Sequence, residues 1–195
     1  MLKKDYIYAG IIGLITAVFV SILLPDSFPI PKWTLFVILP IGEYVGYVLA
    51  SSLFSHILFL KQLGRFGIVG LMNFSVDTGI AIMLRRYFEI PAESYQMLPL
   101  FTISFVIAVT NSYFWQRIWT FAEKDPPTRR EFIKFLVVTL IGMGINTLVA
   151  FATIQGISSL NGFDDDMLIT ISKIAATAIS LFWNFLGYKF IVFRE

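Results

Sequence analysis

The chain has 195 residues, of which 57% are hydrophobic and 14% are charged, whereas about 25% of the residues in a typical soluble domain are charged. A soluble protein of this size needs more polar cover than these residues supply, and a lipid bilayer removes that need. The composition therefore excludes a soluble enzyme. The net charge of +2 gives no argument for nucleic-acid binding. Because there is no cysteine and only one histidine, we expect no metal site, no cofactor and no catalytic centre.

Six apolar segments are long enough to cross the roughly 30 Å of bilayer hydrocarbon, which takes about 20 residues of helix. Backbone amides in lipid need partners within the chain, and the segments lack the alternation of barrel strands, so we expect helices. The sequence therefore predicts an all-α, multi-pass membrane bundle. The predicted spans are 6–24, 33–54, 66–84, 98–115, 132–154 and 167–188.

The first two segments have particular features. The first is expected to be retained as a helix, because its apolar core is long for a secretory signal and residues 25–28 make a poor cleavage site. The second contains Pro40, which predicts a kinked helix followed by a short interfacial stretch that reaches Leu60. Gly42 and Gly46 are spaced for a helix-packing face and are a candidate interface for a homodimer.

Lysine and arginine in the short loops predict the orientation, because they are enriched on the cytoplasmic side. With the N-terminus inside, 11 of the 15 basic residues lie in the cytoplasm. We therefore expect a protein of the cytoplasmic membrane with both termini cytoplasmic. The acidic loop at residues 161–166 is then external, and we expect it to be solvated.

The last four predicted helices resemble a duplicated two-helix unit. A shift of 69 residues places Arg65 on Lys134 and Asp77 on Asn146, and a shift of 72 places Arg117 on Lys189. The second shift also aligns two faces of small residues spaced four apart, which let helices approach closely. These are Ser104, Ala108 and Ser112, aligned with Ala176, Ser180 and Asn184. Since each half has two helices, the halves share one orientation.

Several polar side chains are predicted to lie inside the membrane. A charge such as that of Asp77 costs about 2.5–3.5 kcal/mol at the centre of a helix span, so it is expected to face protein or water. Asn73 lies one turn earlier on the same face. The remaining intramembrane amides are Asn111, Asn146 and Asn184.

The basic residues at the helix ends have two interpretations. Arg65 and Lys134 begin their helices at the cytoplasmic side, and Arg117 and Lys189 end theirs there. They either snorkel and set the topology, or they form a ring around an anionic head group. Lys173 lies inside the last apolar segment, where it is a candidate partner of Asp77, a candidate phosphate contact, or a snorkelling residue.

Four ordered blocks of residues run through these helices. They are Arg65-Phe66 with Val69-Gly70, Asn73 and Asp77; Asn111 with Arg117-Ile118-Trp119-Thr120-Phe121; Lys134-Phe135 with Asn146; and Trp183-Asn184-Phe185-Leu186 with Lys189 and Val192-Phe193-Arg194. In this order and spacing, residues 61–195 resemble the GtrA-like family of small membrane proteins. The resemblance implies a four-helix membrane domain at 61–195, preceded by two additional helices in residues 1–60. Lys189 stands where the family often has arginine, and lysine lacks the bidentate fork of arginine.

The resemblance also implies a function in cell-surface polysaccharide synthesis, which is the translocation of polyprenyl-phosphate-linked sugar across the membrane. The implied site comprises Asn73, Asp77, Asn111, Arg117, Asn184 and Lys189, and the implied partners are the lipid-linked sugar, membrane lipid and a membrane glycosyltransferase. One alternative is a scaffold that supports such a transferase without transporting anything. Another is a proton-coupled exporter of small cations that uses Glu43 or Asp77. The sequence has no nucleotide-binding loop of the Gly-xxxx-Gly-Lys-Ser/Thr type.

Overall fold

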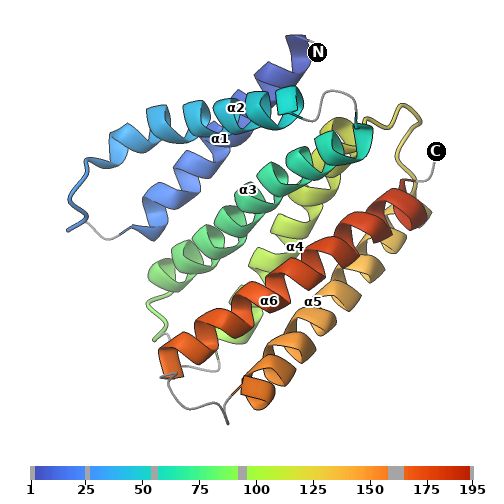
Figure 1. Ribbon diagram of the computed structural model, residues 1–195. Coiled ribbons are helices and arrows are strands. Elements are labelled where there is room, and N and C mark those ends of the chain that lie inside the picture. Colours follow the sequence, from blue (N-terminus) through green and yellow to red (C-terminus); the bar gives the residue numbers. More distant parts are fainter. Residues whose placement is uncertain (1–2, 25–26, 54–56, 92–95, 158–164, 194–195) are drawn as a thin grey trace. The chain divides into compact units, whose positions relative to one another are not determined.

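The computed structural model describes residues 3–24, 27–53, 57–91, 96–157 and 165–193. In this part of the chain the structure is all-helical, as predicted (Figure 1). Six helices are long and apolar enough to cross a membrane. They are α1 (Lys3–Leu23), α2 (Leu35–Leu53), α3 (Leu58–Tyr87), α4 (Met97–Trp115), α5 (Arg129–Ile157) and α6 (Asp165–Gly187). A short 3₁₀-helix, η1 (Lys32–Thr34), precedes α2, and two π-helical turns, η2 (Gln116–Thr120) and η3 (Tyr188–Val192), follow α4 and α6.

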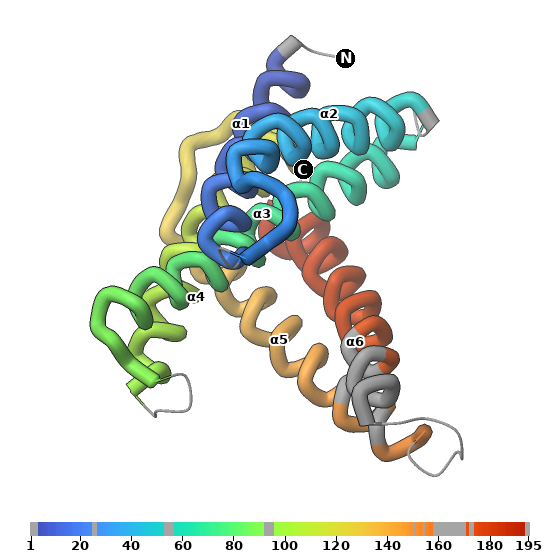
Figure 2. Tube along the Cα trace, turned by 90° about the vertical axis from the view of Figure 1, so that its left-hand side faces the viewer, coloured from blue at the N-terminus to red at the C-terminus, as the bar shows by residue number. Residues whose placement is uncertain are grey.

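The chain divides into two compact units, Met1–Lys124 and Asp125–Glu195. The first unit holds α1 to α4 with η2, and the second holds α5, α6 and η3. Within the first unit, α1 and α2 lie against α3 (Figure 2). The division at residue 60 that the resemblance implies follows the family pattern, whereas the division at Lys124 follows packing.

Helix α3 begins earlier than the apolar pattern indicates. Its first residue is Leu58, and the Lys61 N–H already donates to the Ile57 carbonyl at 3.2 Å. The interfacial stretch predicted to follow the second span is therefore wrong, since residues 58–65 form the first two turns of α3. Hydropathy marks where a helix leaves the hydrocarbon, whereas backbone hydrogen bonds continue beyond that depth.

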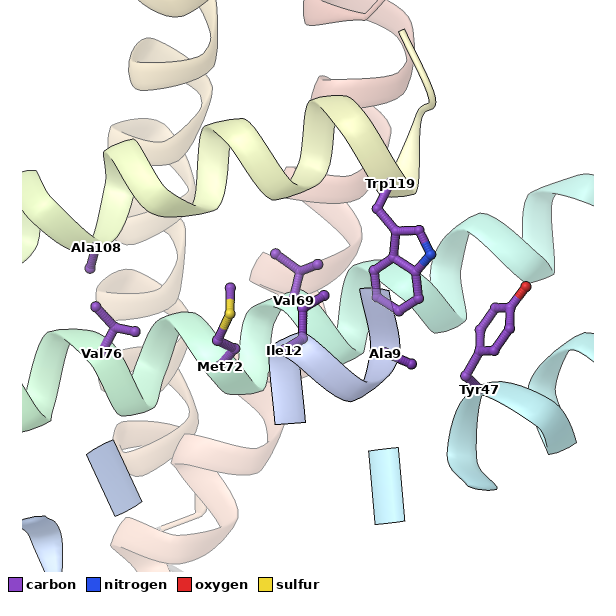
Figure 3. Packing of buried hydrophobic residues seen from close by; sticks show 8 residues of the cluster. All are labelled: Ala9, Ile12, Tyr47, Val69, Met72, Val76, Ala108 and Trp119. Carbon is purple, nitrogen blue, oxygen red and sulfur yellow. The ribbon is translucent and has the colours of Figure 1, made fainter. Parts of the chain in front are cut away.

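The core of the first unit lies where α1, α3, α4 and the end of α2 meet (Figure 3). Its buried residues are Ala9, Ile12, Tyr47, Val69, Met72, Val76, Ala108 and Trp119. The small-residue face predicted on α4 is confirmed, because Ser104, Ala108 and Ser112 are all buried. Large apolar side chains on the outside, such as Phe74 and Leu98, are exposed, as expected for a surface covered by lipid.

The closest approach of α1 and α2 occurs at a glycine that the sequence analysis did not select. A Cβ atom added to Gly13 would meet the Pro40 Cα atom, so only glycine lets the two backbones come this close. By contrast, a Cβ atom added to Gly42 or Gly46 would meet nothing within 4 Å. The prediction of a packing face at these two glycines is therefore wrong within this chain, and their place in a homodimer stays a prediction.

The second unit is a hairpin of α5 and α6 closed by aromatic and polar contacts. The Phe135 and Tyr188 rings stack with centroids 4.2 Å apart, and the Tyr188 hydroxyl lies 2.7 Å from the Thr139 Oγ1 atom. The Trp183 indole N–H donates to the Val138 carbonyl at 3.1 Å. These contacts join the first half of α5 to the last turns of α6.

Candidate functional site

Arg65 is the centre of a cluster at the end of the first unit where α1 and α3 begin. Its Nη2 atom lies 3.0 Å from Asp5 Oδ2 and donates to the Tyr47 hydroxyl at 3.3 Å. Its Nη1 atom donates to the Trp119 carbonyl at 2.9 Å. The guanidinium carbon also lies 5.6 Å from the centroid of the Tyr47 ring and 5.8 Å from that of the Trp119 indole, within range for a cation–π interaction.

The Arg65 cluster joins four separate elements, because Asp5 comes from α1, Tyr47 from α2, Arg65 from α3 and Trp119 from η2. Arg65 therefore does more than snorkel to the interface. The sequence analysis selected Arg65 but missed Asp5 and Tyr47. The one available signal was an acidic residue directly after two lysines at the start of an apolar helix.

The π-helical turn η2 carries buried polar side chains. It is closed by the Phe121 N–H, which donates to the Gln116 carbonyl at 2.9 Å. Gln116, Trp119 and Thr120 are each 1% exposed, and their Oε1, Nε1 and Oγ1 atoms have no hydrogen-bond partner. Arg117, a predicted site residue, is buried in the same turn. π-helical turns occur frequently at functional sites.

Deeper in the first unit, polar groups line the contact between α3 and α4. The Ser104 hydroxyl donates to Asp77 Oδ1 at 2.7 Å, so the intramembrane carboxylate does face protein, as predicted. The Asn111 amide nitrogen lies 4.0 Å from the Met72 sulfur. Asn73 carries a buried Oδ1 atom without a hydrogen-bond partner.

The second unit repeats the basic contact of the first. The Lys134 Nζ atom donates to the Ile191 carbonyl at 3.1 Å, and Ile191 is 72 residues after Trp119. The turn η3 is closed by the Phe193 N–H, which donates to the Tyr188 carbonyl at 2.8 Å, as Phe121 closes η2. The Lys189 Nζ atom lies 5.9 Å from the centroid of the Phe190 ring.

The amides of the second unit also lie between its two helices. Asn146 donates to the Ser180 hydroxyl at 3.1 Å. The Asn184 side chain fills the space beside Gly142 so closely that a Cβ atom there would meet it, and its Oδ1 atom has no hydrogen-bond partner. Lys173 lies on α6, but its side chain is outside what the structure describes.

The predicted site residues thus divide evenly between the two units. Arg65, Asn73, Asp77, Asn111 and Arg117 belong to the first unit, and Lys134, Asn146, Lys173, Asn184 and Lys189 belong to the second. The ring of four basic residues and the pairing of Lys173 with Asp77 each involve both units, and they stay predictions. Among the described residues, no group of three or more histidine, aspartate and glutamate side chains is placed to hold a metal ion.

A second buried carboxyl group lies between α1 and α2. Glu43 is 6% exposed, and its Oε1 atom accepts from the Thr16 hydroxyl at 2.8 Å, while Oε2 has no hydrogen-bond partner. The Thr16 Oγ1 atom also lies 2.9 Å from the Ile12 carbonyl. Glu43 therefore has a partner in the additional helices, and it does not take part in the contacts of α4.

The family described as GtrA/DPMS, transmembrane domain, matches residues 65–193. The chain belongs to this family. It is also 31% identical over 136 residues to YngA, an uncharacterized membrane protein of Bacillus subtilis (strain 168), and this match covers 70% of the chain and 82% of YngA. No solved structure matches the chain.

Membership in the GtrA/DPMS family assigns a multi-pass membrane protein to processes that involve glycosyl lipids. The matched segment begins at Arg65 and includes η2, η3 and all ten predicted site residues. Members of the family are generally non-catalytic membrane proteins. Helices α1 and α2 lie outside the matched segment, although they supply Asp5 and Tyr47 to the Arg65 cluster.

Proposed function

We propose that the protein translocates polyprenyl-phosphate-linked sugar across the cytoplasmic membrane, with both termini cytoplasmic. The observation that carries this proposal is Asp77. It lies on a membrane-spanning helix of a glycosyl-lipid family, and its one described hydrogen bond comes from Ser104. A carboxylate accepts up to about four hydrogen bonds, so Asp77 keeps acceptor capacity for the hydroxyl groups of a sugar.

The spacing of polar residues along α3 supports a path for a polar head group. Asp77 is 12 residues after Arg65 and Asn73 is 8 residues after it, which places them about 18 Å and about 12 Å deeper along the helix axis. A sugar that moves past these side chains exchanges hydrogen bonds stepwise, so it does not enter hydrocarbon unpaired. The basic residues at the helix ends attract the phosphate, and the gradient of the lipid-linked sugar supplies the driving force.

Flipping of a fluorescent polyprenyl-phosphate sugar in liposomes that contain only this protein tests the proposal. We expect the wild-type protein to transfer the lipid between leaflets and the Asp77→Asn substitution to lower the initial rate at least about tenfold. The substitution keeps the shape of the side chain and removes its charge. Ser104→Ala is expected to have a smaller effect, because it removes the resting partner and leaves the carboxylate.

Thr102→Val is the matched control, since Thr102 is an exposed residue of α4 whose hydroxyl donates to the Leu98 carbonyl. Its rate is expected to equal that of the wild type. If folded wild-type protein moves no lipid and co-purifies with a glycosyltransferase, the scaffold function replaces translocation. If pH-dependent cation efflux is measured instead and is lost with Asp77 or Glu43, the exporter function replaces it.

A further inference from the structure

The two π-helical turns end equivalent helices, but they differ in the polarity of their side chains. In η2, three buried polar atoms have no hydrogen-bond partner, and they belong to Gln116, Trp119 and Thr120. The residues 72 positions later in η3 are Tyr188, Ile191 and Val192. The first of these has Thr139 beside its hydroxyl, and the other two are apolar. The polar atoms of η2 are therefore not needed to build the turn.

Such unpartnered atoms identify the kind of ligand that fits the turn. A buried polar atom without a partner costs about 1–3 kcal/mol, so a native protein that keeps several of them calls for an explanation. Trp119 Nε1 and Arg65 Nε are both in this state, and both groups can only donate. The Thr120 hydroxyl can donate as well. A group rich in acceptor oxygens next to a guanidinium satisfies all three, and a phosphate is such a group.

One anion already occupies this cluster. Asp5 lies 3.0 Å from Arg65 Nη2 and is itself buried, although it leaves Arg65 Nε without a partner. Figure 3 shows the nitrogen-bearing edge of the Trp119 indole turned toward the side on which Tyr47 lies, and the two rings are 5.6 Å apart. The Arg65 guanidinium contacts both residues, so the unmet indole N–H belongs to the same cluster as the ion pair.

We propose that Arg65, Trp119 and Thr120 form a binding site for the phosphate group of the polyprenyl carrier, and that Asp5 fills this site until the lipid displaces it. The identity of the lipid rests on the proposed function. A phosphate monoester has three terminal acceptor oxygens where a carboxylate has two, so it can reach donors that Asp5 leaves unmet. Displacement requires movement of the first turn of α1 only, because Ala9 and Ile12 remain in the core.

Binding of a fluorescent polyprenyl monophosphate to the full chain in phosphatidylcholine nanodiscs tests this inference. We expect Asp5→Asn to tighten binding at least about tenfold, and Arg65→Gln and Thr120→Val to weaken it, Arg65→Gln by at least about tenfold. Asp5→Glu keeps the carboxylate and Asp125→Asn removes a carboxylate that is exposed, so both are expected to bind within about twofold of the wild type. Circular dichroism and gel filtration check that each variant is folded.

Two further arms of the experiment sharpen the result. Inorganic phosphate is expected to compete only weakly, because it lacks the apolar chain, and equal competition would assign the site to free phosphate. Hydrogen–deuterium exchange in residues 3–9 is expected to rise when the lipid binds. This readout separates displacement of Asp5 from a general effect of charge on affinity.

Equal affinity of the wild type and Asp5→Asn, or unchanged affinity in Arg65→Gln, overturns the inference. A variant that loses its fold is replaced by Trp119→Phe, which removes the indole N–H and keeps an aromatic ring, and this variant is expected to weaken binding. The inference and the proposed function fail separately. Affinities that change as expected without any flipping in liposomes leave the phosphate site in place and reject translocation, whereas Asp77-dependent flipping with unchanged affinities does the opposite.

Discussion

The hairpins α3–α4 and α5–α6 have the same frame and different polar side chains. In each, a basic residue of the first helix bonds to a main-chain carbonyl of the terminal π-helical turn, Arg65 to Trp119 and Lys134 to Ile191. The frame is therefore independent of what each turn carries. Only the first of these hairpins joins its basic residue to a carboxylate and leaves polar atoms of its turn unmet.

The intramembrane layers of the two hairpins differ in a related way. A 69-residue shift places Gly142 where the first hairpin has Asn73, and a 72-residue shift places Asn184 where it has Ser112. The large amide and the small residue have thus exchanged helices. Each hairpin still holds one buried amide oxygen without a partner at this layer, Asn73 Oδ1 in one and Asn184 Oδ1 in the other. The volume is conserved while the chemistry has moved from one helix to the other.

The largest expected difference between the hairpins is in stability. Arg65→Ala leaves Asp5 buried without its cation, so we expect it to lower the free energy of unfolding by about 3 kcal/mol. Lys134→Ala removes one hydrogen bond to a carbonyl and is expected to cost about 1 kcal/mol. Titration with dodecyl sulfate in mixed micelles, followed by circular dichroism, measures both values. Equal losses would contradict the comparison, and Asp5→Asn combined with Arg65→Ala is expected to restore part of the loss.

A smaller effect is expected at the exchanged layer. Gly142→Ala places a Cβ atom against Asn184, which overpacks the α5–α6 contact and is expected to cost about 1–3 kcal/mol. Gly144→Ala is the matched control, because a Cβ atom there meets nothing within 4 Å, and it is expected to be neutral or slightly stabilising. The same titration compares them. A Gly142→Ala variant as stable as the wild type would show that the Asn184 side chain can leave this layer.

The smallest expected effect concerns the π-helical turns themselves. Thr120→Val installs the residue that η3 has at the equivalent position, and the lost hydroxyl has no partner, so without lipid its stability is expected to stay within about 0.5 kcal/mol of the wild type. The reverse change, Val192→Thr, buries a new hydroxyl and is expected to cost about 1 kcal/mol. A clear loss of stability in Thr120→Val would make its hydroxyl part of the fold.

Apolar periodicity was sufficient to predict the number and type of the helices, because a membrane span needs a long apolar run whatever its neighbours are. It did not predict where α3 begins, because Lys61 and Arg65 lie in helical turns beyond the apolar run. The two π-helical turns have no local signal in the sequence. They became visible only as equivalent positions in a structure with a repeat.

The candidate site was predicted in its parts and not in its contacts. Asp77 had to face a polar group, and the sequence could not indicate that this group is Ser104, 27 residues away. Asn146 shows the difficulty, since the repeat places Ala176 where the first hairpin has Ser104. Alanine offers no hydroxyl, and the amide bonds to Ser180 one turn further along. Asp5 and Arg65 are 60 residues apart, and their pairing depends on the packing of α1 against α3.

The central claim is that the α3–α4 hairpin holds the phosphate, while the α5–α6 hairpin repeats its frame without this site. Photocrosslinking tests it most directly, with a polyprenyl-phosphate sugar that carries a diazirine on the isoprene unit next to the phosphate. We predict that the label attaches to peptides that contain Arg65 or η2, that excess unlabelled lipid prevents this, and that Asp5→Asn increases it. Labelling confined to peptides that contain Lys134 or η3 would contradict the claim.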